Sequence, residues 1–437
     1  MNAKSAFMAG VVLCTAWAAS PCVAAWVVDP DSIRVESEAF QPPPCSAAGK
    51  SFAQPQPVSP VIEASRFGAV GDGVTDDSDA IGRALDSLHD GGTLRLEPGR
   101  TYLKRKIIKI IRPGVRLWGY GATVKTVTTE EEVGRGKGQS PLSIYLLGPR
   151  TGIYGLTIIS NLRTRLVGHP NDSAIYMAGP GQEAIDNRIE YTGVGVLLEG
   201  ASDFLVARNT VFRTTADGIH MTNGSRHGRV LCNIVRETGD DMIAVVNYGT
   251  GPPSIGDFLI EQNDVAGQYA GRGISVVGGR NVTIRSNRIS QTTAAAGIYI
   301  ASESSWNTAS VEDVLVEENW ISEVQTTAAA YNPISFTRKT GHGAVHIQSA
   351  GPPHQIENVV VRDNHVERTL RDGIYIAGNV RRVGIDGNQT WQTGRHPIYI
   401  EAPGPEQVGC RGNAADGNAI NPEGCEGDLP SAKGASW

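Results

Sequence analysis

The chain has 437 residues, of which 40% are hydrophobic and 19% are charged, so it can bury a sizeable core and lacks the composition of a disordered protein. Its 52 glycines are scattered without a collagen period and indicate many tight turns, which favours a β-rich fold. The formal net charge of −6 argues against nucleic acid as a partner.

Residues 1–25 have the pattern of a cleaved secretory signal peptide. A single Lys4 precedes the apolar stretch 6–13, and small residues end the segment. A lipoprotein anchor is the competing interpretation, but the residues before Cys14 and Cys22 do not resemble the small-residue box that lipidation requires. No other segment approaches the ~20 apolar residues of a membrane helix. We therefore expect a secreted or periplasmic protein without membrane contact, and an N-terminal extension over residues 26–60.

Residues 66–99 are expected to form an N-terminal cap. The run 66–77 leads into apolar residues spaced for one face of a helix, with Asp76 or Asp77 as the N-cap and Gly91-Gly92 at the end. The apolar residues are Ala80, Ile81, Ala84, Leu85 and Leu88. Such a helix would cover the apolar cross-section that a repeat structure exposes at its first coil.

A four-residue block with apolar-x-apolar alternation recurs through the rest of the chain. Its copies begin at Ser143, Ala174, Gly195, Gly218, Met242, Gly273, Gly297, Ala344, Gly373 and Pro397. From Gly195 the steps are 23, 24, 31, 24, 47, 29 and 24 residues, and the longer steps mark insertions that loop outward, the largest at 301–343. A period near 24 predicts a solenoid whose turns contribute short strands to parallel sheets. Leucine-rich repeats share this period, but their leucine pattern and helical return segment are missing.

A second marker, an asparagine after a β-rich run, follows the same period. Its members are Asn161, Asn187, Asn209, Asn233, Asn263, Asn287, Asn319, Asn364 and Asn388. We interpret this column as an internal ladder in which stacked amides satisfy one another and the backbone at a tight turn. Surface turn residues are the alternative interpretation.

These patterns predict an all-β fold, a right-handed single-stranded parallel β-helix over 61–402 with an N-terminal capping helix. The run 66–77 and the coils after it resemble the pectate-lyase-like and glycoside hydrolase family 28-like (polygalacturonase-like) β-helix superfamily, over roughly 61–402. That superfamily includes hydrolases, lyases, epimerases and phage tailspikes. The resemblance therefore implies the fold more strongly than the chemistry.

Four cysteines remain beyond the signal segment, an even number that indicates disulfides in an oxidising compartment. Cys410 and Cys425 flank a stretch with little hydrophobic content, and we expect them to staple a C-terminal tail over 403–437. Cys45 and Cys232 form a second, weaker candidate pair. Zinc binding is disfavoured because no second cysteine or histidine sits at ligand spacing from any of the four.

The middle residue of each block is expected to face solvent, because the aliphatic residues beside it point inward. This column contains Tyr145, Tyr176, Leu197, His220, Ala244, Ser275, Tyr299, His346, Tyr375 and Tyr399. Rows of tyrosine and histidine suit a sugar polymer, although exposed tyrosine also has a high β propensity. The candidate substrate-binding residues are His220, Arg272, Tyr299, His346 and Tyr375.

An acidic cluster is expected on the same face. Asp217, Asp241 and Arg272 precede the block on successive coils, about 4.8 Å apart per coil, and Asp240 lies at the edge. Three carboxylates this close cannot all ionise easily, so at least one pKa should rise and the group supplies both an acid and a base.

The text around these residues, 215–219 and 238–245, resembles the polygalacturonase signature, in which Asn-Thr-Asp-Gly is followed one coil later by Gly-Asp-Asp-Cys-Ile-Ala. The resemblance implies that Asp240 is the general acid and that Asp217 and Asp241 activate water. The sequence departs from the family at two places. The family's Gly-His-Gly is Gly-Arg-Gly at 271–273, and the family's Arg-Ile-Lys, which grips the substrate carboxylate, is replaced by Tyr-Ile-Ala at 299–301. Galacturonate specificity therefore does not carry over. A Gly-His-Gly at 341–343 lies too many coils downstream to take the family's role.

We expect an exported enzyme that hydrolyses a polysaccharide, most simply by inversion and without a cofactor. The same residues permit another interpretation, in which Asp217, Asp240 and Asp241 bind Ca²⁺ and Arg272 abstracts a proton from a uronate, as in a polysaccharide lyase or an epimerase. A non-catalytic carbohydrate-binding β-helix is the third alternative. The sequence leaves the sugar and the oligomeric state open.

Overall fold

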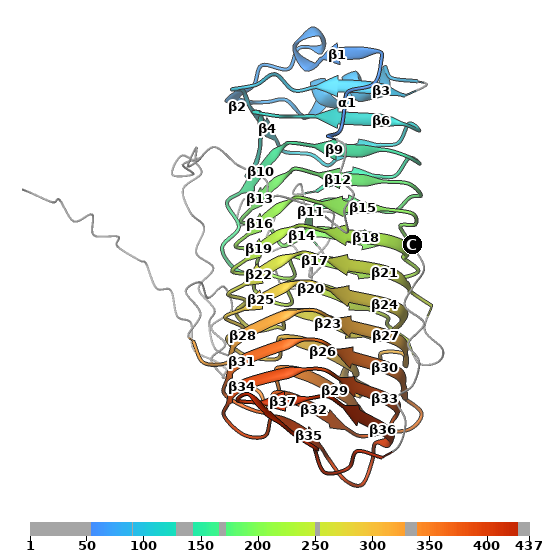
Figure 1. The fold of residues 1–437 in the computed structure, drawn as a ribbon. Helices are drawn as coiled ribbons and strands as arrows, with labels where there is room; N and C mark the ends of the chain where they lie inside the picture. The colour runs from blue at the N-terminus through green and yellow to red at the C-terminus, as the bar shows by residue number, and fades with distance from the viewer. Residues whose placement is uncertain are drawn as a thin grey trace, which may run out of the picture.

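The computed structural model describes residues 54–89, 91–127, 143–165, 172–249, 254–327 and 339–426. The chain winds into a long column with its N-terminal coils at one end and its C-terminal coils at the other (Figure 1). The central coils each contribute one short strand to each of three sheets, which contain 13, 14 and 11 strands because the coils at the two ends are incomplete. The predicted signal segment 1–25 and most of the predicted extension 26–60 lie outside the described residues.

The three sheets are called A, B and C. Sheet A contains β1 (Val61–Glu63), β3 (Gly92–Arg95), β6 (Val115–Trp118), β9 (Gly152–Tyr154), β12 (Glu183–Ile185), β15 (Leu205–Ala207), β18 (Arg226–Leu231), β21 (Gly256–Glu261), β24 (Gly279–Arg285), β27 (Val311–Glu317), β30 (Ile356–Arg362), β33 (Val380–Asp386) and β36 (Glu406–Arg411). Sheet B contains β2 (Asp72–Asp76), β4 (Thr101–Lys104), β7 (Thr123–Thr126), β10 (Thr157–Ser160), β13 (Arg188–Glu190), β16 (Thr210–Phe212), β19 (Ile234–Arg236), β22 (Asp264–Ala266), β25 (Arg288–Ser290), β28 (Trp320–Val324), β31 (His365–Thr369), β34 (Gln389–Thr393), β37 (Ala414–Ala415) and β38 (Asn418–Ala419). Sheet C contains β5 (Ile108–Ile110), β8 (Ile144–Leu146), β11 (Ser173–Met177), β14 (Val194–Glu199), β17 (Ile219–Thr222), β20 (Ile243–Val246), β23 (Ile274–Val277), β26 (Ile298–Ser302), β29 (Val345–Ser349), β32 (Ile374–Ala377) and β35 (Ile398–Ile400).

The predicted repeat is the register of sheet C. The middle residues of successive blocks pair directly, including across the 47-residue step, where Tyr299 pairs with His346. That step therefore holds a single coil and an outward excursion, as expected. Glycine opens the block because neighbouring coils meet there: a Cβ on Gly218 would lie 2.5 Å from the Met242 carbonyl oxygen. The aliphatic residues after the glycine point inward and are buried in one continuous core.

The asparagine ladder is confirmed as an internal stack at the turn from sheet A to sheet B. Each amide donates to the next side chain, as from Asn263 Nδ2 to Asn287 Oδ1 at 3.0 Å, and each accepts from the preceding backbone. The stack runs from Asn187 through the predicted members to Asn388 and continues to Asn413, which the sequence analysis did not include. Including Asn161 was wrong: it follows β10, whereas the ladder position in that coil is Leu156, whose N–H donates to Asn187.

The N-terminal end of the column carries the one α-helix of the described residues, α1 (Ser78–Asp86) (Figure 1). Its predicted apolar face is buried. Asp77 takes the N-cap position, but its carboxylate accepts the N–H groups of Val70 and Gly71 instead of capping the helix. The helix ends at Asp86, before the predicted Gly91-Gly92. Two short 3₁₀ turns, η3 (Ala64–Phe67) and η4 (Ser304–Trp306), complete the elements.

The boundary expected at residue 402 is one coil too early. β36 pairs in parallel with β33, and β37 pairs with β34, so the column extends into the region predicted as a tail. The disulfide Cys410–Cys425 ties β36 to the chain after it. Cys232 is also disulfide-bonded, while its expected partner Cys45 lies outside the described residues. In the described part of the chain, no helix is long and apolar enough to cross a membrane.

Candidate active site

The turns that lead from sheet B into sheet C bring the predicted acidic residues together. Asp217, Asp241 and Arg272 stand two residues before the adjacent strands β17, β20 and β23. Backbone bonds between the turns fix this stacking, from Gly218 N–H to the Asp241 carbonyl and from Met242 N–H to the Arg272 carbonyl, both 2.9 Å. The three residues therefore lie on successive coils of one face, as the repeat spacing predicts.

Asp217 is paired with a histidine of its own strand. His220 Nδ1 lies 2.8 Å from Asp217 Oδ2, and both side chains are largely buried. Burial alone raises the pKa of Asp217, but His220, Arg165 and Arg272 together hold it below its ordinary value. Burial lowers the pKa of His220, but the nearby Asp217 carboxylate raises it by more, so the pKa of the imidazole is above its ordinary value. Asp217 is thus the carboxylate of the cluster that stays ionised.

Asp240 is the most accessible carboxylate of the three, with 28% of its side chain exposed against 12% for Asp217 and 5% for Asp241. Its Oδ2 lies 2.7 Å from Arg165 Nη1. Arg165 belongs to the excursion after β10, three coils earlier, and reaches along the column to this turn. Burial and the neighbouring Asp217 raise the pKa of Asp240, while the Arg165 guanidinium opposes the shift.

Asp241 is held by groups of the next coil. Its Oδ1 accepts the backbone N–H of Arg272 at 2.6 Å, and its Oδ2 accepts the Ser275 hydroxyl at 2.5 Å. This close approach requires glycine at 271, where a Cβ would lie 2.3 Å from the Asp241 nitrogen. Burial raises the pKa of Asp241 to about 7 against the influence of Arg272, and the charges of Asp240 and Asp217 add to the shift. The cluster therefore contains one carboxyl whose pKa is lowered and two whose pKa values are raised.

Arg272 stands between two acids and an aromatic ring. Its guanidinium contacts Asp241 Oδ1 at 3.4 Å, pairs with Glu303, and lies 4.3 Å from the centre of the Tyr299 ring. Burial lowers its pKa, but Asp241 and Glu303 outweigh burial and raise it above the ordinary value. Arg272 is consequently a permanent cation and a poor proton acceptor.

An aromatic stack continues along sheet C from Arg272. Tyr299 stacks on His342 at 4.7 Å and on His346 at 5.5 Å, and His346 stacks on Tyr375 at 4.5 Å. His346 Nδ1 accepts the N–H of Gly343, so Nε2 carries the proton and donates to Gln348. Burial lowers the pKa of His346 to about 4, so the ring is neutral at physiological pH. His342 belongs to this stack, and among the described residues it forms no hydrogen bond or ion pair with the three aspartates, as its distance along the repeat predicts.

The expectation that the middle column faces solvent is wrong over the central coils. His220, Ala244, Ser275, Tyr299 and His346 are buried, and exposure returns only toward the ends, as at Tyr399. The reason is that excursions from the column supply side chains over this face: Arg165 contacts Asp240, and Glu303 contacts Arg272. The predicted alternation of inward and outward side chains along the strands is correct. The covering of the outward face could not be predicted, because the excursions that cover it do not recur with the repeat.

Sequence reasoning therefore missed Arg165, Glu303, Tyr248 and Trp306 as neighbours of the site. Glu303 and Trp306 lie in an insertion that the 47-residue step had marked. Tyr248 follows β20, and the pKa of its hydroxyl is raised to about 12 by partial burial and by the charges of the three aspartates. The length of an insertion was the available signal for Glu303 and Trp306, and Arg165 and Tyr248 had none.

The three aspartates do not fit a shared Ca²⁺ site. Each carboxylate is engaged by a different cation or donor set: His220 for Asp217, Arg165 for Asp240, and the Arg272 and Ser275 donors for Asp241. Among the described residues, no group of three or more His, Cys, Asp or Glu side chains is arranged to hold a metal ion.

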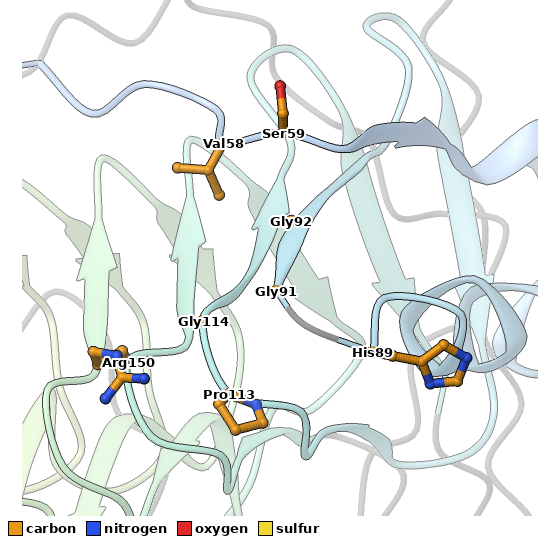
Figure 2. Close-up of a pocket in the computed structure, with 8 residues that line it drawn as sticks. All are labelled: Val58, Ser59, His89, Gly91, Gly92, Pro113, Gly114 and Arg150. Atoms are coloured by element: carbon orange, nitrogen blue, oxygen red, sulfur yellow. The ribbon is translucent and has the colours of Figure 1, made fainter.

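A pocket lies far from this cluster, beside the N-terminal cap (Figure 2). Its lining is largely backbone at Gly91, Gly92 and Gly114, and the His89 and Arg150 side chains stand on opposite sides of it. It gathers no acid–base pair and is not a candidate active site.

Comparison with known proteins supports the fold. The family described as "Right handed beta helix region" matches residues 173–338. The catalytic unit of a GH87 α-1,3-glucanase from Streptomyces thermodiastaticus strain HF3-3 aligns with a TM-score of 0.60 at 19% identity, covering 85% of this chain and 72% of that chain. No match is found among curated proteins.

Two further solved structures are similar at 15% identity. PfbA, a surface adhesin of Streptococcus pneumoniae, has a TM-score of 0.60 and covers 85% of this chain and 96% of that chain. A hyperthermoactive exopolygalacturonase from Thermotoga maritima has a TM-score of 0.59, covering 84% and 94%. The predicted architecture is thus confirmed: the chain is a right-handed parallel β-helix protein.

Proposed function

We propose that the protein is an exported glycoside hydrolase that cleaves a polysaccharide with Asp240 as the general acid and Asp217 as the base that activates water. The observation that carries this proposal is the contrast between these two carboxyls on one face. The Asp217 pKa is lowered and the Asp240 pKa is raised, and Asp240 is the more accessible. Similar β-helix proteins include a glucanase and an exopolygalacturonase, which supports carbohydrate as the substrate class.

Asp241 takes a different role in this proposal from the one that the family resemblance implies. Because its pKa is raised to about 7, Asp241 carries a proton at acidic pH, and both of its oxygens are engaged by the next coil, so it is less available than the ionised Asp217 to accept a proton from water. It holds the backbone N–H of Arg272 in place. An inverting enzyme places its acid and base about 6.5–9.5 Å apart with a water between them, and the proposal expects Asp217 and Asp240, on adjacent turns, to take these two positions.

The lyase and epimerase alternatives need a base at Arg272. A guanidinium with a raised pKa holds its proton, so this chemistry is disfavoured. Incubation with α-1,3-glucan, polygalacturonate and mannuronan, following reducing ends and the absorbance of unsaturated uronates, distinguishes the classes. Hydrolysis gives reducing ends alone, a lyase gives both signals, and an epimerase gives neither. Activity that is lost in a chelator and restored by Ca²⁺ would contradict the proposal.

The assignment of the acid is tested by leaving-group dependence. Asp240→Asn should abolish cleavage of the natural glycan and spare aryl glycosides with good leaving groups, because these need little protonation. Asp217→Asn should impair both substrates, since water must still be activated. Equal loss on both substrates for Asp240→Asn, or retention of anomeric configuration in the first product, would refute the assignment.

A further inference from the structure

Two large aromatic side chains stand exposed beside the acidic cluster. Tyr248 is 47% exposed and Trp306 is 66% exposed, whereas the residues of the site itself are largely buried. Neither belongs to the aromatic stack on sheet C. One exposed tryptophan is ordinary at a protein surface, but two exposed rings on adjoining segments next to a polar site form a candidate binding surface.

The two residues lie on segments that pair with each other. Tyr248 forms an antiparallel bridge with Thr308, the N–H of Gly249 donates to the Asn307 carbonyl at 2.6 Å, and the N–H of Ala309 donates to the Asn247 carbonyl at 2.9 Å. Trp306 ends η4, two residues before that bridge. Trp306 is therefore close in the chain to the residue that pairs with Tyr248, which brings the two aromatic residues to neighbouring segments of the same surface.

The segment that carries Trp306 is also fixed to the acidic cluster. Glu303, at the start of η4, pairs with Arg272, and Arg272 contacts Asp241. The Thr308 hydroxyl accepts the N–H of Glu303 at 2.7 Å, and Thr308 is buried. Tyr248 follows β20, the strand that Asp241 precedes, and partial burial and the charges of the three aspartates raise the pKa of its hydroxyl. The backbone segments that carry the two aromatic residues are thus fixed to each other and to Arg272.

We propose that Tyr248 and Trp306 form an aromatic rim that binds a sugar ring of the glycan next to the acidic cluster. This proposal rests on the proposed function for the identity of the ligand. The apolar face of a pyranose packs on an indole or phenol ring, while its hydroxyls remain available for hydrogen bonds, so an exposed ring at the mouth of a polar site suits a carbohydrate. A protein partner at the rim is the alternative that the experiment must separate.

The test measures glycan binding in the full chain carrying Asp240→Asn, so that bound probes are not consumed. The probes are hexasaccharides of α-1,3-glucan, galacturonate and mannuronate, with calorimetry as the readout. Trp306→Ala should weaken binding of the recognised probe about tenfold, because one stacking contact is lost. Tyr248→Ala should weaken it as well, and Tyr248→Phe, which keeps the ring, should not.

Trp320→Ala is the matched control. Trp320 is 47% exposed on β28 of sheet B, where its ring stacks on His365 at 4.2 Å. Because it lies away from the proposed rim, the Trp320→Ala substitution should leave glycan binding unchanged. The proposal is overturned if Trp306→Ala binds like its parent, if Trp320→Ala loses as much affinity, or if no probe binds and only a protein partner is captured. If binding depends on Trp306 but the chain with Asp240 intact hydrolyses none of the glycans, the rim is sustained and the hydrolase is refuted.

Discussion

The three carboxylates of the acidic cluster have different pKa shifts because each one contacts a different partner. Asp217 has a histidine, Asp240 an arginine from a distant excursion, and Asp241 a donor set from the next coil. Three similar side chains therefore hold their protons differently within one face, as acid–base catalysis requires. The sequence predicted that a pKa would rise, but it contained no sign of Arg165, whose approach depends on how an excursion packs.

Arg165 should control the alkaline limb of activity. A general acid must be protonated, so activity falls as the pH rises through its pKa, and Arg165 lowers the pKa of Asp240. Arg165→Gln should raise that pKa and move the alkaline limb of kcat/KM to higher pH. Arg165→Lys keeps the charge and should move the limb less. If the pH profile of kcat/KM is the same in Arg165→Gln as in the parent, Arg165 does not set the pKa of the general acid.

Asp241 should make stability depend on pH. Its pKa is raised to about 7 in the folded protein, so the folded state binds more protons than the unfolded state between about pH 4 and pH 7. The contribution of Asp241 to stability therefore decreases as the pH rises through this window. Asparagine does not titrate, so Asp241→Asn removes this pH dependence. The Tm of the variant minus the Tm of the parent should therefore increase from pH 5 to pH 8. A Tm difference that is constant with pH would contradict the assigned pKa.

At the scale of the element, the turn between sheets A and B shows what a sequence can reveal. The asparagine column and its function were readable because the same residue recurs at the same place in each coil. The residue before each asparagine adopts a left-handed conformation even when it is not glycine, as at Arg208 (φ 53°) and Glu318 (φ 55°). Nothing in the sequence marks these residues, because the stacked amides, and not the residue type, hold the turn.

The ladder should be a major source of stability. Asn263 accepts from Asn233 and donates to Asn287 and to the Val230 carbonyl, all in the buried interior. Asn263→Ala leaves these groups without partners and should destabilise the protein by about 2–4 kcal/mol in urea unfolding. Asn379→Ala, which removes one partly buried bond to the His354 carbonyl, should cost less than about 1 kcal/mol. If the two substitutions destabilise the protein equally, the asparagine ladder contributes no more to stability than an ordinary side-chain hydrogen bond.

At the scale of the whole molecule, periodicity decided what was predictable. The architecture, the register and the cap follow from repeated residues, and the structure agrees with them. The last coil was missed because the repeating block marks sheet C, whereas β36 and β37 belong to sheets A and B and no further sheet C strand follows β35 among the described residues. The covered face over the acidic cluster was missed because insertions are unique segments, and only their lengths could be read.

The ends of a solenoid expose unpaired strand edges, and the two ends here are closed differently. α1 covers the first coil, whereas the last coil has the short antiparallel pair β37–β38 and the disulfide Cys410–Cys425, which closes a loop of 15 residues. Bridging a loop of that length stabilises by about 3 kcal/mol in the chain-entropy account. This bond should therefore hold the C-terminal edge in place.

Removing the bond should loosen this end and leave the rest of the column unchanged, because the strands of each coil pair only with strands of the adjacent coils. In Cys410→Ser/Cys425→Ser, amide exchange should accelerate in β35 and β36 and remain at parental rates in β17 and β20, which carry the acidic cluster. Glycan hydrolysis should be retained, and the uncovered edge should promote end-to-end association that size-exclusion chromatography detects at high concentration. Faster exchange throughout the column, with loss of activity, would mean that the coils unfold as one cooperative unit and that the C-terminal closure stabilises all of them.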